Sequence, residues 1–235
     1  MKKNQWHGVD QHPELHIGQY IVPNFVSNSV AIQVSAHEYV LISPGEPLLA
    51  PFQSQFSSDV KLHIVFPNAY HHMGVTSWQQ AYPDAKLYAS RMALQQLIKK
   101  GFDEKSINPL ELTALPLPEG YDVLFPPGHR AGDIWIRKQH GKNTSWITCD
   151  SFLNYKRMSN QPVARFMQKQ LGAAPGLKIS QVVKWFILND RQAFKAWALA
   201  QLEHDQPSTL IPSHGEIQQD ETLATKIKQL IQARL

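Results

Sequence analysis

The sequence PNAYHHMG occupies residues 67–74 and directly follows the apolar run KLHIVF at residues 61–66. The run is rich in β-branched and aromatic residues and ends at a Pro-Asn pair, so it predicts a strand followed by a loop. Two adjacent histidines, His71 and His72, lie in that loop. Loops that follow the strands of a rigid sheet often carry functional side chains, so this stretch predicts a site at one edge of a sheet.

Three later segments place a similar side chain where a predicted strand ends. They are His129 in PPGHRAGD, Asp150 directly after SWITC, and His214 in IPSHGE. Imidazole and carboxylate groups suit Zn, Fe, Mn or Ni better than Ca or Mg. We therefore expect one divalent metal ion, most readily zinc, with a candidate ligand set of five side chains: His71, His72, His129, Asp150 and His214.

Three of the candidate ligands also have a simpler explanation. His129 could stabilise a turn, and His214 could be a turn residue before Gly215. Asp150 could be the N-cap of a helix that starts at the next residue. The other seven histidines are interpreted as surface residues that each make one hydrogen bond: His7, His12, His16, His37, His63, His140 and His204.

Strand-like and helix-like patterns occur in two successive series along the chain. Strands are predicted at residues 30–34, 39–43, 61–66, 86–89, 121–125, 133–138, 144–149 and 209–212. Helices are predicted to begin at Thr76, Ser90, Ser180, Asp190 and Asp220, and the pattern is expected to turn helical after Asp150. Two such series favour two packed sheets with helices outside, in one domain that spans residues 1–235.

The order of the motifs resembles that of the metallo-β-lactamase-fold hydrolase superfamily, over roughly Val30 to the C-terminus. That superfamily has an H-x-H-x-D-H-x-G loop after a strand, then G-H-t-x-G, an Asp at a strand end and a late His-Gly pair. PNAYHHMG, PGHRAGD, ITCD and SHGE occur here in the same order, and YPDAKLYAS resembles the helix-to-strand step after the first motif. Ser43 in ISPGE falls where the superfamily often has Asp before Gly. The resemblance implies an α/β fold, a four-layer αβ/βα sandwich.

The first motif departs from the superfamily pattern. When His72-Met73-Gly74 is aligned, Pro67 and Ala69 fall where the first two histidines belong, and His71 falls where the Asp belongs. Pro and Ala have no side-chain donor atom. The resemblance therefore implies that the usual first metal site keeps only His129.

The usual second metal site keeps more of its ligands. The resemblance implies that His72 and His214 remain there, with Asp150 as the bridging carboxylate and His71 in place of the Asp. Catalytic zinc typically has three protein ligands and one open position, so one metal ion is expected rather than two. The N-x-x-H-H variant resembles a divergent branch of the superfamily, in which Asn68 takes a polar role.

Composition and charge narrow the expected partners. The chain has 235 residues, of which 43% are hydrophobic and 18% charged, so it is expected to fold around a sizeable core. Residues 151–207 carry eight Lys and Arg against three Asp and Glu. This helical segment is expected to cover the site and to attract an anionic small-molecule substrate, although solvated helix faces would show the same charge pattern. No nucleic-acid motif is present, so a nucleic-acid partner is not expected.

Two further features concern the location of the protein. No apolar run approaches the ~20 residues that a membrane helix needs, and the first residues lack the apolar core of a secretory signal. Cys149 is the single cysteine, so no internal disulfide can form. A cytoplasmic protein without a membrane partner is expected.

Two classes of function remain open from the sequence. In the first, a metal-dependent hydrolase, the metal is held by His72, His129, Asp150 and His214. His71 is a further ligand or a general base, and Arg130 holds an anionic substrate. In the second, the chain is a non-catalytic metal- or ligand-binding protein on a hydrolase scaffold that has lost ligands.

Overall fold

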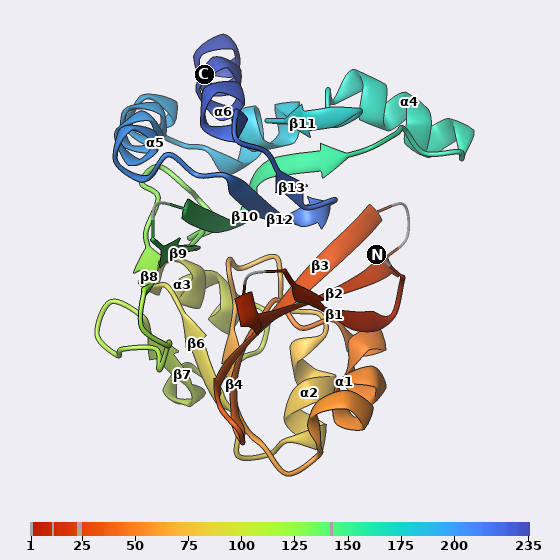
Figure 1. The fold of residues 1–235 in the computed structure, drawn as a ribbon, viewed down its shortest axis with the longest axis vertical. Helices are drawn as coiled ribbons and strands as arrows, with labels where there is room; N and C mark the ends of the chain where they lie inside the picture. Colours follow the sequence, from red (N-terminus) through yellow and green to blue (C-terminus); the bar gives the residue numbers. More distant parts are fainter. Residues whose placement is uncertain (1, 11, 23–24, 142) are drawn as a thin grey trace. The chain divides into compact units, whose positions relative to one another are not determined.

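The computed structural model describes residues 2–10, 12–22, 25–141 and 143–235 (Figure 1). The chain divides into two compact units, Met1–Glu119 and Gly120–Leu235. Each unit has its own hydrophobic cluster of buried side chains. One domain over residues 1–235 remains a prediction.

The strands of the first unit pair in the order in which they occur in the sequence. Four of them pair antiparallel: β1 (Gln5–Val9), β2 (His12–Val22), β3 (Phe25–Ser35) and β4 (Glu38–Ile42). Three more continue the sheet parallel to β4: β5 (Lys61–Val65), β6 (Lys86–Ala89) and β7 (Ile107–Pro109). Strands in the parallel part of a sheet are covered on both faces, which explains why every residue of β5 after Lys61 is buried.

Three helices contribute to the core of the first unit, namely α1 (Leu49–Phe56), α2 (Val75–Ala81) and α3 (Arg91–Lys99). At its centre the Phe52 ring makes edge contacts with Trp6 and Trp78, at ring-centroid distances of 5.7 and 5.2 Å. The two indole N–H groups donate to backbone carbonyls, Trp6 to Leu48 and Trp78 to Gly45. These bonds fix the loop that follows β4, because buried indole donors need partners.

The strands of the second unit are centred on the long β10 (Asn143–Tyr155). On one side of it lies β9 (Trp135–His140), which is antiparallel to β10, and β8 (Tyr121–Leu124) pairs antiparallel with the far edge of β9. The last residues of β10 also pair with β11 (Gly176–Lys178). On the other side lies the parallel β12 (Thr209–Gly215), which also pairs with β13 (Gln218–Gln219).

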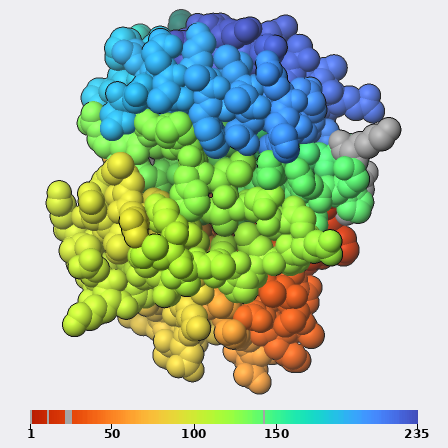
Figure 2. Space-filling model, turned by 90° about the vertical axis from the view of Figure 1, so that its left-hand side faces the viewer, coloured from red at the N-terminus to blue at the C-terminus, as the bar shows by residue number. Residues whose placement is uncertain are grey.

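The helices of the second unit are α4 (Pro162–Gln170), α5 (Arg191–Asp205) and α6 (Leu223–Arg234), together with a π-helical turn at Val183–Ile187. The core joins Trp135 and Trp146 of the sheet to Phe194 of α5 and Ile227 of α6. Helix α5 buries Phe194, Ala198 and Leu202, and α6 buries Leu223, Ile227 and Ile231. The outer face of α5 lies at the surface (Figure 2).

Several local predictions are confirmed. The range predicted for β6 is the observed one, and the Ser90 side chain caps α3 by accepting a hydrogen bond from the Ala93 N–H. Asp190 caps α5 in the same way. Thr76 is not a cap, because α2 already begins at Val75.

Two predictions about the candidate site were wrong in structural detail. The chain does not turn helical after Asp150, because β10 continues through Phe152 to Tyr155. Asp150 is therefore not a helix N-cap, and His214 lies inside β12 rather than after it. The buried aromatic side chains of Phe152 and Tyr155 favour the extended strand.

The N-terminal hairpin β1–β2 and helix α1 were not predicted from the sequence. The strand HPELHIGQYIV contains Pro, Gly and two His, which are weak strand signals. Pairing with β1 on one side and β3 on the other outweighs these preferences. Within the described ranges, no helix is long and apolar enough to cross a bilayer.

The surface interpretation was wrong for His12 and His63, which are buried. His63 lies between Glu38 Oε1 and the Tyr88 hydroxyl, at 2.8 and 3.0 Å. Burial lowers the pKa of His63, and the neighbouring Glu38 opposes this effect only in part. Burial also lowers the pKa of His16.

These two histidines predict the direction in which pH changes stability. A histidine whose folded pKa is lowered stabilises the fold fully above its unfolded pKa of about 6.5, and this contribution is lost as the pH falls below that value. The melting temperature should therefore fall as the pH is lowered from 7 to 5. His63→Gln should reduce the slope of melting temperature against pH, whereas His37→Gln, in an exposed turn, should not. Equal slopes for His63→Gln and the unchanged protein would contradict this account.

Candidate metal centre

Asp150 and His214 meet on two neighbouring parallel strands of the second unit. Asp150 Oδ1 lies 3.2 Å from His214 Nε2. The pairing of β10 with β12 is regular up to Thr148 and then shifts, so that Leu153 is the next residue of β10 in register. Such an irregularity re-aims side chains, and here it lies at Asp150.

The residue after His214 must be glycine. Gly215 has a φ of +99°, and a Cβ at this position would lie 2.1 Å from the carbonyl oxygen of Asn154. The Asn154 amide in turn donates to the backbone carbonyl of Glu216, at 2.9 Å. The His-Gly pair is thereby held against the end of β10.

Two other ionisable groups lie near Asp150. Burial raises the pKa of the Cys149 thiol, and the negative charge of Asp150 adds to this effect. The same two causes raise the pKa of the Tyr155 phenol. In the absence of a cation, both groups stay protonated near neutral pH.

His129 is buried in the loop between β8 and β9. Its Nδ1 lies 3.2 Å from Asp133 Oδ2, and its Nε2 lies 3.2 Å from Ser151 Oγ. The ring also packs edge-on against Phe194, with a centroid distance of 4.9 Å. Nε2 thus has a hydrogen-bond partner, whereas the buried Nδ1 has a carboxylate nearby but forms no hydrogen bond.

In the first unit, Asn68 shapes the loop that carries the paired histidines. Its buried Oδ1 accepts hydrogen bonds from the backbone N–H groups of Tyr70 and His71, at 2.8 and 3.2 Å. Asn side chains commonly close turns in this way. The polar role expected of Asn68 is therefore observed as the closure of this turn.

His71 makes a short contact with the loop that follows β4. Its Nδ1 lies 2.7 Å from Ser43 Oγ, and the Ser43 carbonyl accepts from the Ser29 hydroxyl at 2.6 Å. Ser43 has a φ of +52°, an uncommon conformation for serine. A histidine that binds a metal through one ring nitrogen usually has the other nitrogen hydrogen-bonded. The Ser43 contact supplies such a bond at Nδ1.

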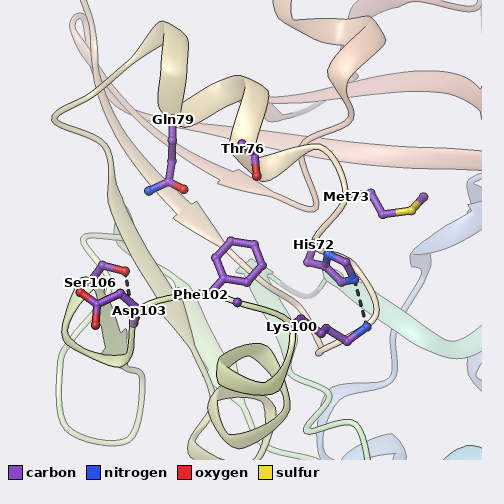
Figure 3. A pocket seen from close by; sticks show the side chains of 9 residues that line it. His72, Met73, Thr76, Gln79, Lys100, Phe102, Asp103 and Ser106 are labelled. Atoms are coloured by element: carbon purple, nitrogen blue, oxygen red, sulfur yellow. Dashed lines mark hydrogen bonds between the residues drawn. The ribbon is translucent and has the colours of Figure 1, made fainter.

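His72 has a different environment from His71. Its Nε2 lies 3.0 Å from Lys100 Nζ. Burial lowers the pKa of His72, and the positive charge of Lys100 lowers it further. The side chains of His72 and Lys100 line a cavity of about 560 Å³, and Phe102 also lines it (Figure 3).

The predicted ligands within each unit have different surroundings. Asp150 and His214 are in contact, whereas His71 and His72 face different neighbours. Among the residues described in the second unit taken alone, no three His, Cys, Asp or Glu side chains have ligand atoms within 4.8 Å of one another. Arg130 is exposed, and its backbone N–H donates to the Ile187 carbonyl.

Sequence reasoning missed several neighbours of the candidate ligands. Asp133 lies four residues after His129 in PGHRAGD, a spacing that could have suggested the contact. The resemblance to the superfamily pattern singles out Ser43 but does not indicate that it contacts His71. Lys100 carried no signal, since it is one of two lysines at the end of a helix.

The fold is similar to that of solved metallo-β-lactamases. A metallo-β-lactamase from Pontibacter korlensis matches with a TM-score of 0.63 and 14% identity, covering 97% of this chain and 99% of the other. The metallo-β-lactamase FIM-1 from Pseudomonas aeruginosa, solved in a mono-zinc form, matches with a TM-score of 0.63 and 15% identity, covering 99% and 97%. A metallo-β-lactamase from Hirschia baltica matches with a TM-score of 0.61 and 14% identity, covering 97% of both chains.

These likenesses confirm the predicted fold class, an α/β fold of the metallo-β-lactamase type. No protein-family model and no curated protein matches the sequence. At this level of identity, the comparisons establish the fold and leave the activity to be argued from the site.

The loop of the paired histidines depends on a close backbone approach at Gly74. A Cβ there would lie 2.0 Å from the Pro44 carbonyl oxygen, so Gly74→Ala must push this loop away from the one that carries Ser43. We expect a loss of about 1–3 kcal/mol in the free energy of unfolding, measured by urea denaturation. The matched control is Gly8→Ala, because a Cβ at Gly8 meets nothing within 4 Å. A Gly74→Ala variant as stable as the Gly8→Ala control would disprove this packing.

Proposed function

We propose that this chain is a metal-dependent hydrolase that acts on a small-molecule substrate. The observation that carries the proposal is the contact of Asp150 with His214, at 3.2 Å on adjacent strands. A carboxylate and an imidazole held side by side are a typical pair of ligands for zinc. The likeness in fold to metallo-β-lactamases, one of them solved with a single zinc, supports the same reading.

The donor chemistry of three residues suits one zinc ion, with His71 joining Asp150 and His214. His71 suits this assignment because Ser43 contacts its Nδ1, and a metal-binding histidine usually has one ring nitrogen hydrogen-bonded. Three protein ligands and one open position are what a catalytic zinc requires. Iron, manganese or nickel would suit the same donors.

His72 and His129 complete the ligand set proposed from the sequence. The surroundings of His72 are less suited to binding a metal ion. An ammonium group beside His72 Nε2 repels a cation, since both carry positive charge. His129 Nε2 contacts Ser151 Oγ, whereas its buried Nδ1 lies 3.2 Å from Asp133 Oδ2 without forming a hydrogen bond. We therefore assign His72 a supporting role in its loop and keep His129 as a further candidate ligand.

A bound metal of this kind lowers the pKa of its water toward ~7 and polarises the bond that is attacked. Asp150 would hold the metal together with His214, and its carboxylate would also serve as the general base of the hydrolysis. Arg130 is exposed and adjacent to His129, and we propose that it binds an anionic group of the substrate.

Metal content tests the ligand assignment directly. After purification with added zinc and desalting, we expect at most one zinc per chain by elemental analysis. Asp150→Ala, His214→Ala and His71→Ala should each abolish stoichiometric binding, because two ligands are too few. Ser43→Ala should weaken zinc affinity about 10–100-fold by freeing the His71 ring.

The controls for this experiment are His72→Ala and His140→Ala, both of which should retain zinc. Two zinc ions per chain would show that the first metal site of the fold has been rebuilt from other residues. No zinc, and no iron or manganese after loading with those metals, would favour a non-catalytic protein instead.

Activity should depend on the metal and on the charge of the substrate. We expect a screen of esters, lactones and phosphodiesters to give hydrolysis that a chelator removes and zinc restores. Arg130→Ala should raise KM for anionic substrates about tenfold, corresponding to the ~1.5 kcal/mol of one charged hydrogen bond, and should leave neutral substrates unaffected. Hydrolysis that is unchanged by chelation would contradict the proposed chemistry.

A further inference from the structure

The part of the second unit that follows Tyr155 and ends at the first residue of α5 is strongly basic. We call residues 156–191 the basic segment; it contains α4, β11 and the π-helical turn. It carries seven Lys and Arg residues and one acidic residue, Asp190. The basic residues are Lys156, Arg157, Arg165, Lys169, Lys178, Lys184 and Arg191. Such a charge excess attracts anionic surfaces.

Helix α4 turns its apolar side chains toward solvent. It buries only Ala164 and Gln168, which are a small and a polar residue. Val163, Phe166 and Met167 are 77%, 59% and 48% exposed. These three lie three or four residues apart and so share one face of the helix. A surface helix of a globular protein normally shows the opposite arrangement, with its apolar face inward.

A second exposed apolar group lies in the π-helical turn. Trp185 and Phe186 are 56% and 66% exposed, and Arg191 lies over the Trp185 ring at 4.4 Å. The backbone N–H of Gln181, just before this turn, donates to the Leu171 carbonyl at the end of α4. The two apolar groups therefore belong to neighbouring parts of one segment.

We propose that the basic segment binds the surface of an anionic phospholipid bilayer. Aromatic side chains are favoured at the level of the lipid headgroups, where Lys and Arg also meet the negative surface potential. A short helix with an apolar face beside basic residues, as α4 has beside Arg165 and Lys169, is suited to lie in that interface. The proposed binding is to the bilayer surface and involves no membrane-spanning helix. It differs from the expectation, drawn from the sequence, of no membrane partner.

Other partners suit this surface less well. A second copy of the same segment would bring like charges together. Single-stranded nucleic acid would use Phe166, Trp185 and Phe186 for stacking, but the aliphatic Val163 and Met167 offer no face on which a base could stack. The combination of aliphatic, aromatic and basic side chains favours lipid.

The test is co-sedimentation of the full-length chain with vesicles of phosphatidylcholine alone or mixed with phosphatidylglycerol. We expect binding to the mixed vesicles, little binding to the neutral ones, and weaker binding at high salt because the charges are screened. Tryptophan fluorescence should shift to shorter wavelength on binding, and Trp185→Phe should remove most of the shift.

Variants assign the binding to the segment. Phe166→Ser combined with Trp185→Ser should reduce the partition coefficient at least tenfold, and Lys169→Gln about fivefold. The matched control is Leu112→Ser, since Leu112 is 70% exposed but lies in the first unit. Circular dichroism and melting temperatures establish that each variant is folded.

Three results would overturn the proposal. One is no binding to anionic vesicles at low salt. Another is a loss of binding in the Leu112→Ser control as large as that in the double variant. The third is tight binding of a single-stranded oligonucleotide without binding of vesicles. None of these results would bear on the proposed metal site, because the basic segment contains none of its ligands.

Discussion

The contact between Asp150 and His214 is the interaction on which the functional account depends. It requires two parallel strands, β10 and β12, and a shift of register after Thr148. The buried core of Trp135, Trp146 and Phe194 supports these strands. A carboxylate beside an imidazole is the donor pair on which the proposed metal site rests.

The first unit contributes a different constraint, which is the packing of two loops against each other by their backbones. Gly74 must lack a side chain because the Pro44 carbonyl occupies the space where a Cβ would lie. Asn68 closes the turn that follows β5 by accepting a hydrogen bond from the Tyr70 N–H. With this packing in place, Ser43 meets His71 Nδ1. In the proposed site, this serine would have the orienting role that a carboxylate often has beside a metal-binding histidine.

The sequence predicted the fold class well because motif order and strand patterns are local signals. It located the loops of His71 and His129 for the same reason, whereas it placed His214 after the strand that contains it. It did not predict that β10 runs through Asp150, because a capping Asp and a strand Asp look alike without knowledge of the neighbouring strand. Nor did it reveal that His129 contacts Asp133 and Ser151, since such contacts depend on how the loop packs.

X-ray absorption spectroscopy of the zinc-loaded chain tests the central claim most directly. The account predicts one zinc with a first shell of nitrogen and oxygen only, at ~2.0–2.2 Å, with the signature of two imidazole rings from His71 and His214. Cys149 is buried beside Asp150 and is excluded from the proposed ligands. A shell containing sulfur at ~2.3 Å, or a spectrum of zinc surrounded by water alone, would contradict the account.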